Sequence, residues 1–351
     1  MSKRRISRSG NQAGVADPAM AYCGIDVSAK TLTVAVRRAG RDSFEQRGFA
    51  NTAAGHRQLI AWLAGCGAKA RVSLEATGVY SLELSLALDA AQTIELAVLN
   101  PKCVHEFAKS LHRSKTDKAD AIALAEHSLR MEFLRWQRPS HTALQLRAIS
   151  RHIASTTEQN TRLRNQLHAA ETATITPRCV LRDLKRAMAG VARRLLALRR
   201  EAVALILADP ELKPKFAHLI GVKGIAEISA IQLLGELAGL DPAMTVRQWV
   251  AMSGLDPAHH DSGSSVHKRS AISRHGNRNL RNALYMPALS AAHFDPHLKT
   301  FYQQLQARHK TKLQALMAVA RKLLHAIFGM FKTGTPYDGA KLFPAQRHAT
   351  A

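Results

Sequence analysis

Short segments rich in β-forming residues alternate with helical segments over the first hundred residues of the chain. Residues typical of strands occur at 21–26, 31–36, 43–50, 71–75 and 94–99. A helix capped by Asn51 or Thr52 and ending near Leu63 is expected between the third and fourth strands, and a second helix is expected from Tyr80 to Ala90. The order β-β-β-α-β-α-β-α predicts a mixed sheet flanked by helices.

Beyond Pro139 the hydrophobic spacing becomes that of helices. One long helix is expected over residues 141–172 and another over 178–207, separated by β-branched residues before Pro177 that disfavour helix. Two such helices predict an antiparallel hairpin or a coiled-coil dimer arm. A last amphipathic helix is expected from Lys312 to Phe331.

The element order is that of the ribonuclease-H-like fold, so the predicted fold class is α/β followed by α. The α part comprises a long helical coiled-coil region and a helical carboxy-terminal domain. The expected divisions are a basic flexible tail (1–20), the sheet domain (21–135), the coiled-coil region (136–208), the carboxy-terminal domain (209–332) and a loose tail (333–351).

The charge balance restricts the class of partner. The chain has 351 residues with 50 Lys and Arg against 26 Asp and Glu, a net charge of +24, which points to a polyanion such as nucleic acid. We find no apolar run long enough to span a bilayer. The cysteines lie far apart in sequence, which predicts reduced thiols, mostly buried, and no structural zinc (Cys23, Cys66, Cys103 and Cys179).

Four carboxylates occupy places where a metal site is expected. Asp26 and Glu75 end predicted strands, while Asp117 and Asp120 are spaced to lie about one turn apart on one face of a helix. Hard oxygen ligands of this kind suit Mg²⁺ or Mn²⁺. The alternatives are a helix start whose acids favour the helix dipole, and four unrelated surface acids.

A Gly-x-x-Gly turn at residues 221–224 separates two predicted helices. Gly221 and Gly224 would let the backbone approach a phosphate, and Lys223 lies between them, so the segment resembles a helix-hairpin-helix that binds the DNA backbone. The alternative is an ordinary turn between helices.

A glycine- and serine-rich loop around Ser262 leads into a cationic cluster. Small residues beside cations suit phosphate binding and an exposed hydroxyl, although a solvated loop has the same composition. Residue chemistry alone does not choose Ser262 over Ser253, Ser264, Ser265, Ser270 and Ser273. The candidate phosphate-binding residues here are Lys268, Arg269, Arg274, Arg278 and Arg281.

Several separated motifs, taken together, resemble the DEDD transposases. The acidic motifs are Gly24–Ser28, Glu75–Tyr80 and Lys115–Ala121, and the distal motifs are Gly254–Pro257, Ser262-Gly263, Gly276-Asn277 and Leu280-Arg281. Relatives in that family include the Piv-type invertases and the bridge-RNA-guided recombinases of insertion sequence 110 type. The resemblance extends over roughly residues 21–331.

The resemblance implies a RuvC-like amino-terminal domain in which Asp26, Glu75, Asp117 and Asp120 bind Mg²⁺. It implies that Ser262 is the nucleophile of a DNA recombinase or transposase and that a noncoding bridge RNA pairs with donor and target DNA. It further implies a dimer or tetramer in the bacterial cytoplasm, associated with the nucleoid. The alternatives are a metal-dependent RuvC-like nuclease or Holliday-junction resolvase without serine chemistry, and a non-enzymatic basic scaffold.

Overall fold

The computed structural model describes residues 17, 19–76, 78–111, 116–258, 261–262, 266–267, 271–273 and 276–343. Within these ranges, only the backbone is described at residues 79, 261, 262, 266 and 267. The chain divides into two compact units between Arg138 and Pro139, and each is considered by itself.

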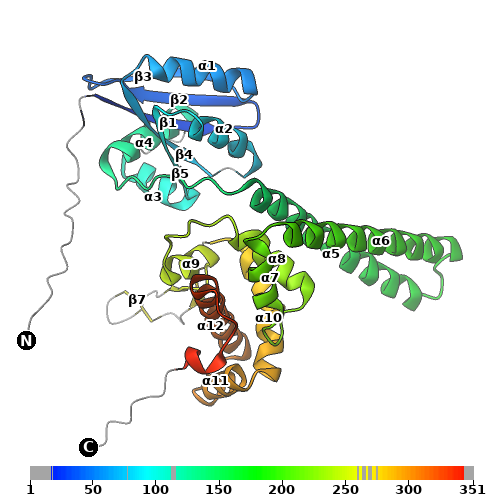
Figure 1. The fold of residues 1–351 in the computed structure, drawn as a ribbon. Coiled ribbons are helices and arrows are strands. Elements are labelled where there is room, and N and C mark those ends of the chain that lie inside the picture. Colours follow the sequence, from blue (N-terminus) through cyan, green and yellow to red (C-terminus); the bar gives the residue numbers. More distant parts are fainter. Residues whose placement is uncertain are drawn as a thin grey trace, which may run out of the picture. The chain divides into compact units, whose positions relative to one another are not determined.

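The first unit is built on a five-stranded mixed sheet (Figure 1). Its strands are β1 (Met20–Val27), β2 (Thr31–Arg37), β3 (Phe44–Ala50), β4 (Lys69–Glu75) and β5 (Ile94–Leu99). The order across the sheet is β3-β2-β1-β4-β5, with β1 antiparallel to β2 and parallel to β4. The mixed sheet and its order of elements therefore confirm the prediction from sequence.

Four helices accompany this sheet. They are α1 (Ala53–Ala64), α2 (Val79–Asp89), α3 (Pro101–Leu111) and α4 (Asp117–Arg130). Cys23 and Ile25 of β1 belong to one hydrophobic core together with Leu59 of α1 and Leu84 of α2. Because side chains alternate along a strand, the intervening residues of β1 face the other side of the sheet. That side is covered by α4, which packs on β1, β2 and β4.

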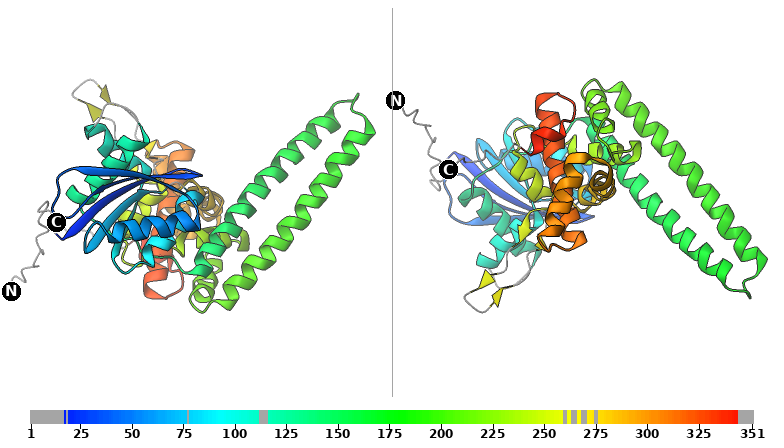
Figure 2. Two further views of the ribbon diagram at one scale, coloured as in Figure 1. Left: turned by 90° about the horizontal axis from the view of Figure 1, so that it is seen from above. Right: turned by 90° about the horizontal axis from the view of Figure 1, so that it is seen from below.

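The second unit begins with two long helices, α5 (His141–Thr172) and α6 (Arg178–Ala208), which pack along one another as a hairpin (Figure 2). The predicted break at Thr174–Pro177 falls between them. Near the turn, Lys185 of α6 pairs with Glu171 of α5 at 3.0 Å. The hairpin is as predicted, while a coiled-coil contact between protomers stays a prediction.

The rest of the second unit is a helical bundle with two short two-stranded ladders. Its helices are α7 (Leu212–Ile220), α8 (Glu227–Leu237), α9 (Val246–Ser253), α10 (Arg278–Phe294), α11 (Pro296–Ala307) and α12 (Lys312–Thr333). Strand β6 (Pro257–Ala258) pairs with β9 (Ala271–Ile272), and β7 (Asp261–Ser262) pairs with β8 (Val266–His267). The helical character predicted beyond Pro139 is thus confirmed.

Helix α12 differs from the sequence expectation in one respect. By length and composition alone, Lys312–Thr333 is apolar enough to cross a membrane, with half of its most apolar window buried inside the protein. Its buried residues, such as Leu323 and Ile327, belong to the hydrophobic core of the second unit, as expected of the core helix of a bundle.

The stretch after α12, which we expected to be loose, has structure as far as residue 343. It forms a short 3₁₀ turn at Gly339–Leu342. Tyr337 donates a hydrogen bond to Asp295 (3.0 Å), the buried residue that also caps α11. Burial and the nearby Asp295 raise the pKa of the Tyr337 hydroxyl.

Candidate active site: an acidic sheet edge and a serine hairpin

Strands β1 and β4 bring Asp26 and Glu75 to the same edge of the sheet. The two strands are parallel, and Ile25 lies opposite Leu74 in the register. Asp26 and Glu75 occupy the next position on each strand. Neighbouring strands lie about 4.8 Å apart, and opposed residues of parallel strands share a face, so the two carboxylates are neighbours. Both residues are half-buried.

Helix α4 points its first turn toward this edge. The Ser128 hydroxyl near the end of α4 donates to the Cys23 carbonyl (3.5 Å), whereas Ala121 and Ala125 lie against Gly24. The helix therefore runs antiparallel to β1, and its beginning lies toward Asp26. A Cβ atom on Gly24 would lie 2.1 Å from the Ala121 oxygen, so only glycine permits this approach.

The first turn of α4 carries the other two acids. The Thr116 hydroxyl caps the helix by accepting a hydrogen bond from the Ala119 amide (3.2 Å). Asp117 is exposed and Asp120 is half-buried. Asp117 precedes Ala121 by four residues, so it lies on the face of the helix that meets the sheet. Tertiary packing thus gathers all four acids toward the carboxyl end of β1.

Carboxylate oxygens are the donors that Mg²⁺ and Mn²⁺ prefer, so the chemistry of this set fits such an ion. In the part of the chain that the structure describes, no group of three or more His, Cys, Asp or Glu side chains is close enough to hold a metal. The acids thus share one edge without forming a closed cage. When bound, a divalent cation would supply Lewis-acid stabilisation of charge at a phosphodiester.

The predicted nucleophile lies in a small hairpin of the second unit. Ser262 is the last residue of β7 and pairs with Val266 of β8. Below this ladder, β6 and β9 close the base of the hairpin. The side chain of Ser262 lies outside the described residues, as do Ser264, Ser265, Ser270, Lys268, Arg269 and Arg274.

Two of the competing serines have structural partners. Ser253 is fully buried, and its hydroxyl donates to the Val250 carbonyl (2.7 Å) at the end of α9. Ser273 donates to a carboxylate oxygen of Asp256 (2.5 Å), next to the β6–β9 pairing. The burial of Ser253 excludes it as a nucleophile that reaches DNA, a distinction that sequence chemistry did not provide.

The Gly-x-x-Gly turn has a packing role that was not predicted. Gly224 has φ +102°, and a Cβ atom there would lie 3.0 Å from atoms of Pro287, Ser290 and Ala291 on α10. Glycine is therefore required for the contact with α10 as well as for the turn. Gly221 and Lys223 are exposed. Helix–turn–helix connectivity is present, and phosphate binding by Gly221, Lys223 and Gly224 stays a prediction.

The two cations at the start of α10 differ in exposure. Arg278 faces solvent, whereas Arg281 donates to the Ser253 carbonyl (2.8 Å). Arg281 thus ties α10 to the end of α9. A contact of either side chain with nucleic acid stays a prediction.

A buried ionic network, missed by the sequence analysis, holds α10 in place. The carboxylate of Glu236 on α8 accepts two hydrogen bonds from Arg151 of α5 (2.7 and 2.9 Å). It accepts a third from the side-chain amide of Asn277 (2.6 Å), which also caps α10. Burial alone would raise the pKa of Glu236, but the bonds from Arg151 and Asn277 outweigh it and lower that pKa. In the sequence, the signal that could have revealed this network is Glu236, the one acid in the largely apolar segment Ile231–Leu237.

Two family models match the chain. One, described as a transposase, matches residues 23–173, which include all four acids of the edge. The other, described as a transposase of the IS116/IS110/IS902 family, matches residues 217–303, which include the hairpin and the start of α10. This chain belongs to the IS110-type DEDD transposase family.

Curated relatives of this family agree. A pilin gene-inverting protein of Moraxella bovis is 27% identical over 322 residues, or 90% of this chain and 97% of that protein. A protein of the same description from Moraxella lacunata matches equally well. An uncharacterized 43.6 kDa protein of insertion element IS110 from Streptomyces coelicolor is 33% identical over 140 residues, which is 40% of this chain and 34% of that protein.

As a member of this family, the chain is a transposase or recombinase, and its substrate is DNA. The strong positive charge agrees with that substrate.

Proposed function

We propose that this transposase is an RNA-guided DNA recombinase of a bacterial mobile element, acting in the cytoplasm at the nucleoid. Its RuvC-like acidic edge would hold Mg²⁺ or Mn²⁺, and Ser262 would be its nucleophile. The observation that supports this most is the convergence of Asp26, Glu75, Asp117 and Asp120 toward one end of β1 through strand register and the packing of α4 on Gly24. Carboxylates from three separate elements at one edge are the arrangement that a phosphodiester-processing site requires.

The serine step follows ordinary phosphoryl-transfer chemistry. The Ser262 hydroxyl would lose its proton as Oγ bonds to the scissile phosphorus, and the bond from phosphorus to the 3′ oxygen would break. The departing 3′ oxygen takes up a proton, which leaves a 5′-phosphoserine linkage. Attack by the 3′ hydroxyl of another strand reverses these steps and releases the serine. The energy of the phosphodiester is conserved, so strand exchange needs no external energy source.

A covalent intermediate distinguishes this mechanism from a hydrolytic nuclease. Whole protein is incubated with end-labelled element and target DNA, and protein–DNA adducts are separated on denaturing gels. We expect adducts for the unmodified chain and none for Ser262→Ala, with the phosphoserine located by mass spectrometry. Ser262→Ala with full strand exchange would eliminate the serine mechanism and favour a RuvC-like nuclease or Holliday-junction resolvase.

The acids are tested with isosteric variants. We expect Asp26→Asn and Asp120→Asn to lower strand exchange by about a thousandfold, because a neutral amide is a poor ligand for a hard cation. Asp42→Asn is the matched control, since Asp42 is a carboxylate on the same unit whose side chain is 96% exposed. Full activity in both acidic variants would remove the metal-site interpretation.

RNA guidance and assembly need separate measurements. If RNA guides the enzyme, protein purified from its host will retain one structured noncoding RNA, and ribonuclease treatment will abolish sequence-directed exchange. Light scattering with and without that RNA would give the number of protomers. Nucleic-acid binding without any DNA reaction would favour the non-enzymatic scaffold.

A further inference from the structure

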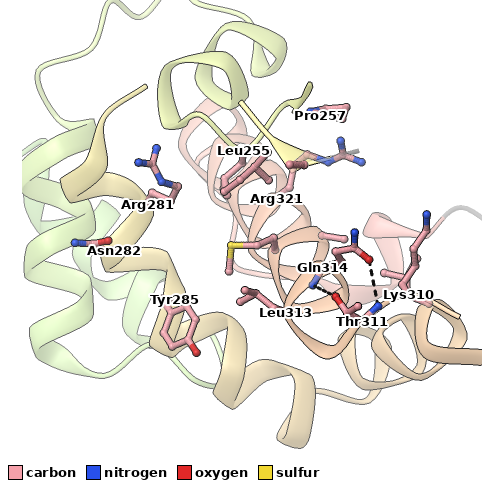
Figure 3. A pocket seen from close by; sticks show the side chains of 15 residues that line it. Leu255, Pro257, Arg281, Asn282, Tyr285, Lys310, Thr311, Leu313, Gln314 and Arg321 are labelled. Atoms are coloured by element: carbon pink, nitrogen blue, oxygen red, sulfur yellow. Dashed lines mark hydrogen bonds between the residues drawn. The ribbon is translucent and has the colours of Figure 1, made fainter. Parts of the chain in front are cut away.

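The second unit contains a pocket whose lining includes neither the four acids nor Ser262 (Figure 3). It lies among α10, α12, the end of α11 and the β6–β9 pair, and its volume is about 450 Å³. Such a volume suits a small organic group, since ligand pockets span roughly 300–1,000 Å³. Most of its exposed wall is apolar, with Leu255, Tyr285, Leu313 and Met317 contributing.

Positive charge surrounds this apolar wall. Arg281, Lys310 and Arg321 line the pocket, and none of the residues described as lining it is acidic. Arg281 is held by the Ser253 carbonyl, while Lys310 is exposed and Arg321 is half-buried. An occupant that matches both features has an apolar planar part and an anionic part. A nucleotide has both, as base and phosphate.

The location of the pocket links it to the hairpin that carries Ser262. Pro257 of β6 and Ile272 of β9 line the pocket, and these strands pair with each other at the base of that hairpin. Ser262 follows the end of β6 by four residues in the sequence. The pocket and the hairpin that carries Ser262 thus share the β6–β9 pair, which makes the DNA strand bound at the hairpin the nearest candidate occupant.

We propose that this pocket binds one unstacked nucleotide of the DNA strand undergoing exchange. Its base packs against the Tyr285 ring beside Leu313 and Met317, and its phosphates contact Lys310 and Arg321. Tyr285 is 40% exposed, so its ring is accessible to a base. An apolar side chain from a second copy of the chain would fill the wall but would bring no counter-charge for the cations. The proposal rests on the proposed function for the identity of the strand.

The test uses the whole protein in EDTA, so that no DNA reaction is required. A short single-stranded oligothymidine carrying one 5-iododeoxyuridine is bound and irradiated, and crosslinked peptides are sequenced by mass spectrometry. We expect the crosslink at Tyr285. Affinity, measured by fluorescence anisotropy, should fall about tenfold in Tyr285→Ala and remain in Tyr285→Phe, because an aromatic ring supplies the stacking.

Two further variants guard against a folding artefact. Met286→Ala is the matched control, because Met286 is the next residue, is 60% exposed and does not line the pocket. Leu313→Glu places a carboxylate in the wall at a position that is 57% exposed, so it should fold normally and still weaken binding. Circular dichroism of each variant checks the fold.

Other results would overturn the proposal. One is a crosslink confined to other peptides, with unchanged affinity in Tyr285→Ala and Leu313→Glu. Another is a changed sedimentation coefficient in these variants with unchanged oligonucleotide binding, which would make the pocket an interface between copies. Failure of the proposed serine mechanism is distinguishable from failure of the pocket proposal. If only the serine mechanism were wrong, Ser262→Ala would recombine normally and the crosslink at Tyr285 would still form.

Discussion

The two units place their family motifs in opposite physical settings. In the first unit, Asp117 and Asp120 lie in the exposed or half-exposed first turn of α4, where they add little to the core. In the second unit, Asn277 caps α10 and bonds the buried Glu236, so this motif residue fixes the packing of three helices. Of these two family motifs, the one with Asn277 has an architectural role, and the exposed or half-exposed setting of Asp117 and Asp120 leaves them accessible for the site proposed above.

The largest expected effect follows from breaking the buried network. Glu236→Ala leaves Arg151 without its counter-ion, and it removes a nearby negative charge from the half-buried Arg147. Because the Arg151 side chain is 44% exposed, water screens its charge, and the main cost is the lost charged acceptor of Asn277 and Arg151. We expect the free energy of unfolding of the second unit to fall by about 2–3 kcal/mol. With Trp62 and Trp136 of the first unit replaced by Phe, urea titration monitored by tryptophan fluorescence reports the second unit through Trp249, which packs against Phe328.

The matched control is Glu158→Ala. Glu158 is a carboxylate on α5 that also pairs with an arginine, but its side chain is 59% exposed and lies 3.8 Å from Arg162, so its loss should cost less than about 1 kcal/mol. Equal effects of the two variants would mean that the Glu236 network does not hold the unit together, and the contrast between the units would disappear.

The next largest effect tests how the acidic edge is positioned. Gly24→Ala places a Cβ atom 2.1 Å from the Ala121 oxygen and 2.3 Å from the Ala125 nitrogen, so α4 must move away from β1. We expect a loss of about 1–3 kcal/mol of stability, as for an overpacked core. Because α4 carries Asp117 and Asp120, strand exchange should fall more than stability alone predicts.

Gly48→Ala is the control for this substitution. Gly48 lies on the exposed side of β3, and the nearest atom to an added Cβ is 3.9 Å away. It should change neither stability nor activity appreciably. Normal recombination by a folded Gly24→Ala protein would show that the position of α4 is not critical for the reaction.

Local features of the sequence anticipated the mixed sheet, the order of its elements along the chain, and the positions of Asp26 and Glu75 at strand ends and of Asp117 and Asp120 at a helix start. They did so because strand ends and helix starts are encoded by neighbouring residues. The contact of α4 with Gly24 and the Glu236 network depend on residues about 100 and 85 positions apart, which periodicity does not connect. The pocket walls come from equally distant segments. Strands of two residues, such as β6 and β9, are too short to show any alternation.

A smaller effect concerns pH, and it distinguishes a half-buried histidine of the first unit from one of the second. Burial lowers the pKa of His127 in the first unit and of His325 in the second, in the latter case assisted by Lys322 and Arg321. As pH falls through the ordinary value of 6.5, the unfolded chain binds protons that the folded chain does not. Stability should therefore decrease between about pH 7 and pH 5.

The comparison variants are His127→Gln and His325→Gln, which cannot take up that proton. Each should flatten the decrease for its own unit, as measured by the urea midpoint at several pH values. A decrease that is unchanged in both variants would assign the pH dependence to other groups. Loss of stability on raising the pH through the same window would contradict the sign of the effect.

The smallest effect uses the cysteines as reporters of each unit. We predicted mostly buried thiols, but only Cys23 and Cys66 are buried, while Cys103 and Cys179 are exposed. Burial also raises the pKa of the Cys23 thiol, which further lowers its reactivity. In the native protein, a maleimide should therefore label Cys103 and Cys179 within seconds and leave the other two unmodified.

Cys23 and Cys66 both belong to the core side of the sheet, so their labelling rate measures the opening of the first unit alone. Glu236→Ala should not change that rate, whereas Gly24→Ala should raise it, because only the latter substitution loosens the packing around β1. Equal acceleration by both variants would mean that the two units unfold as one.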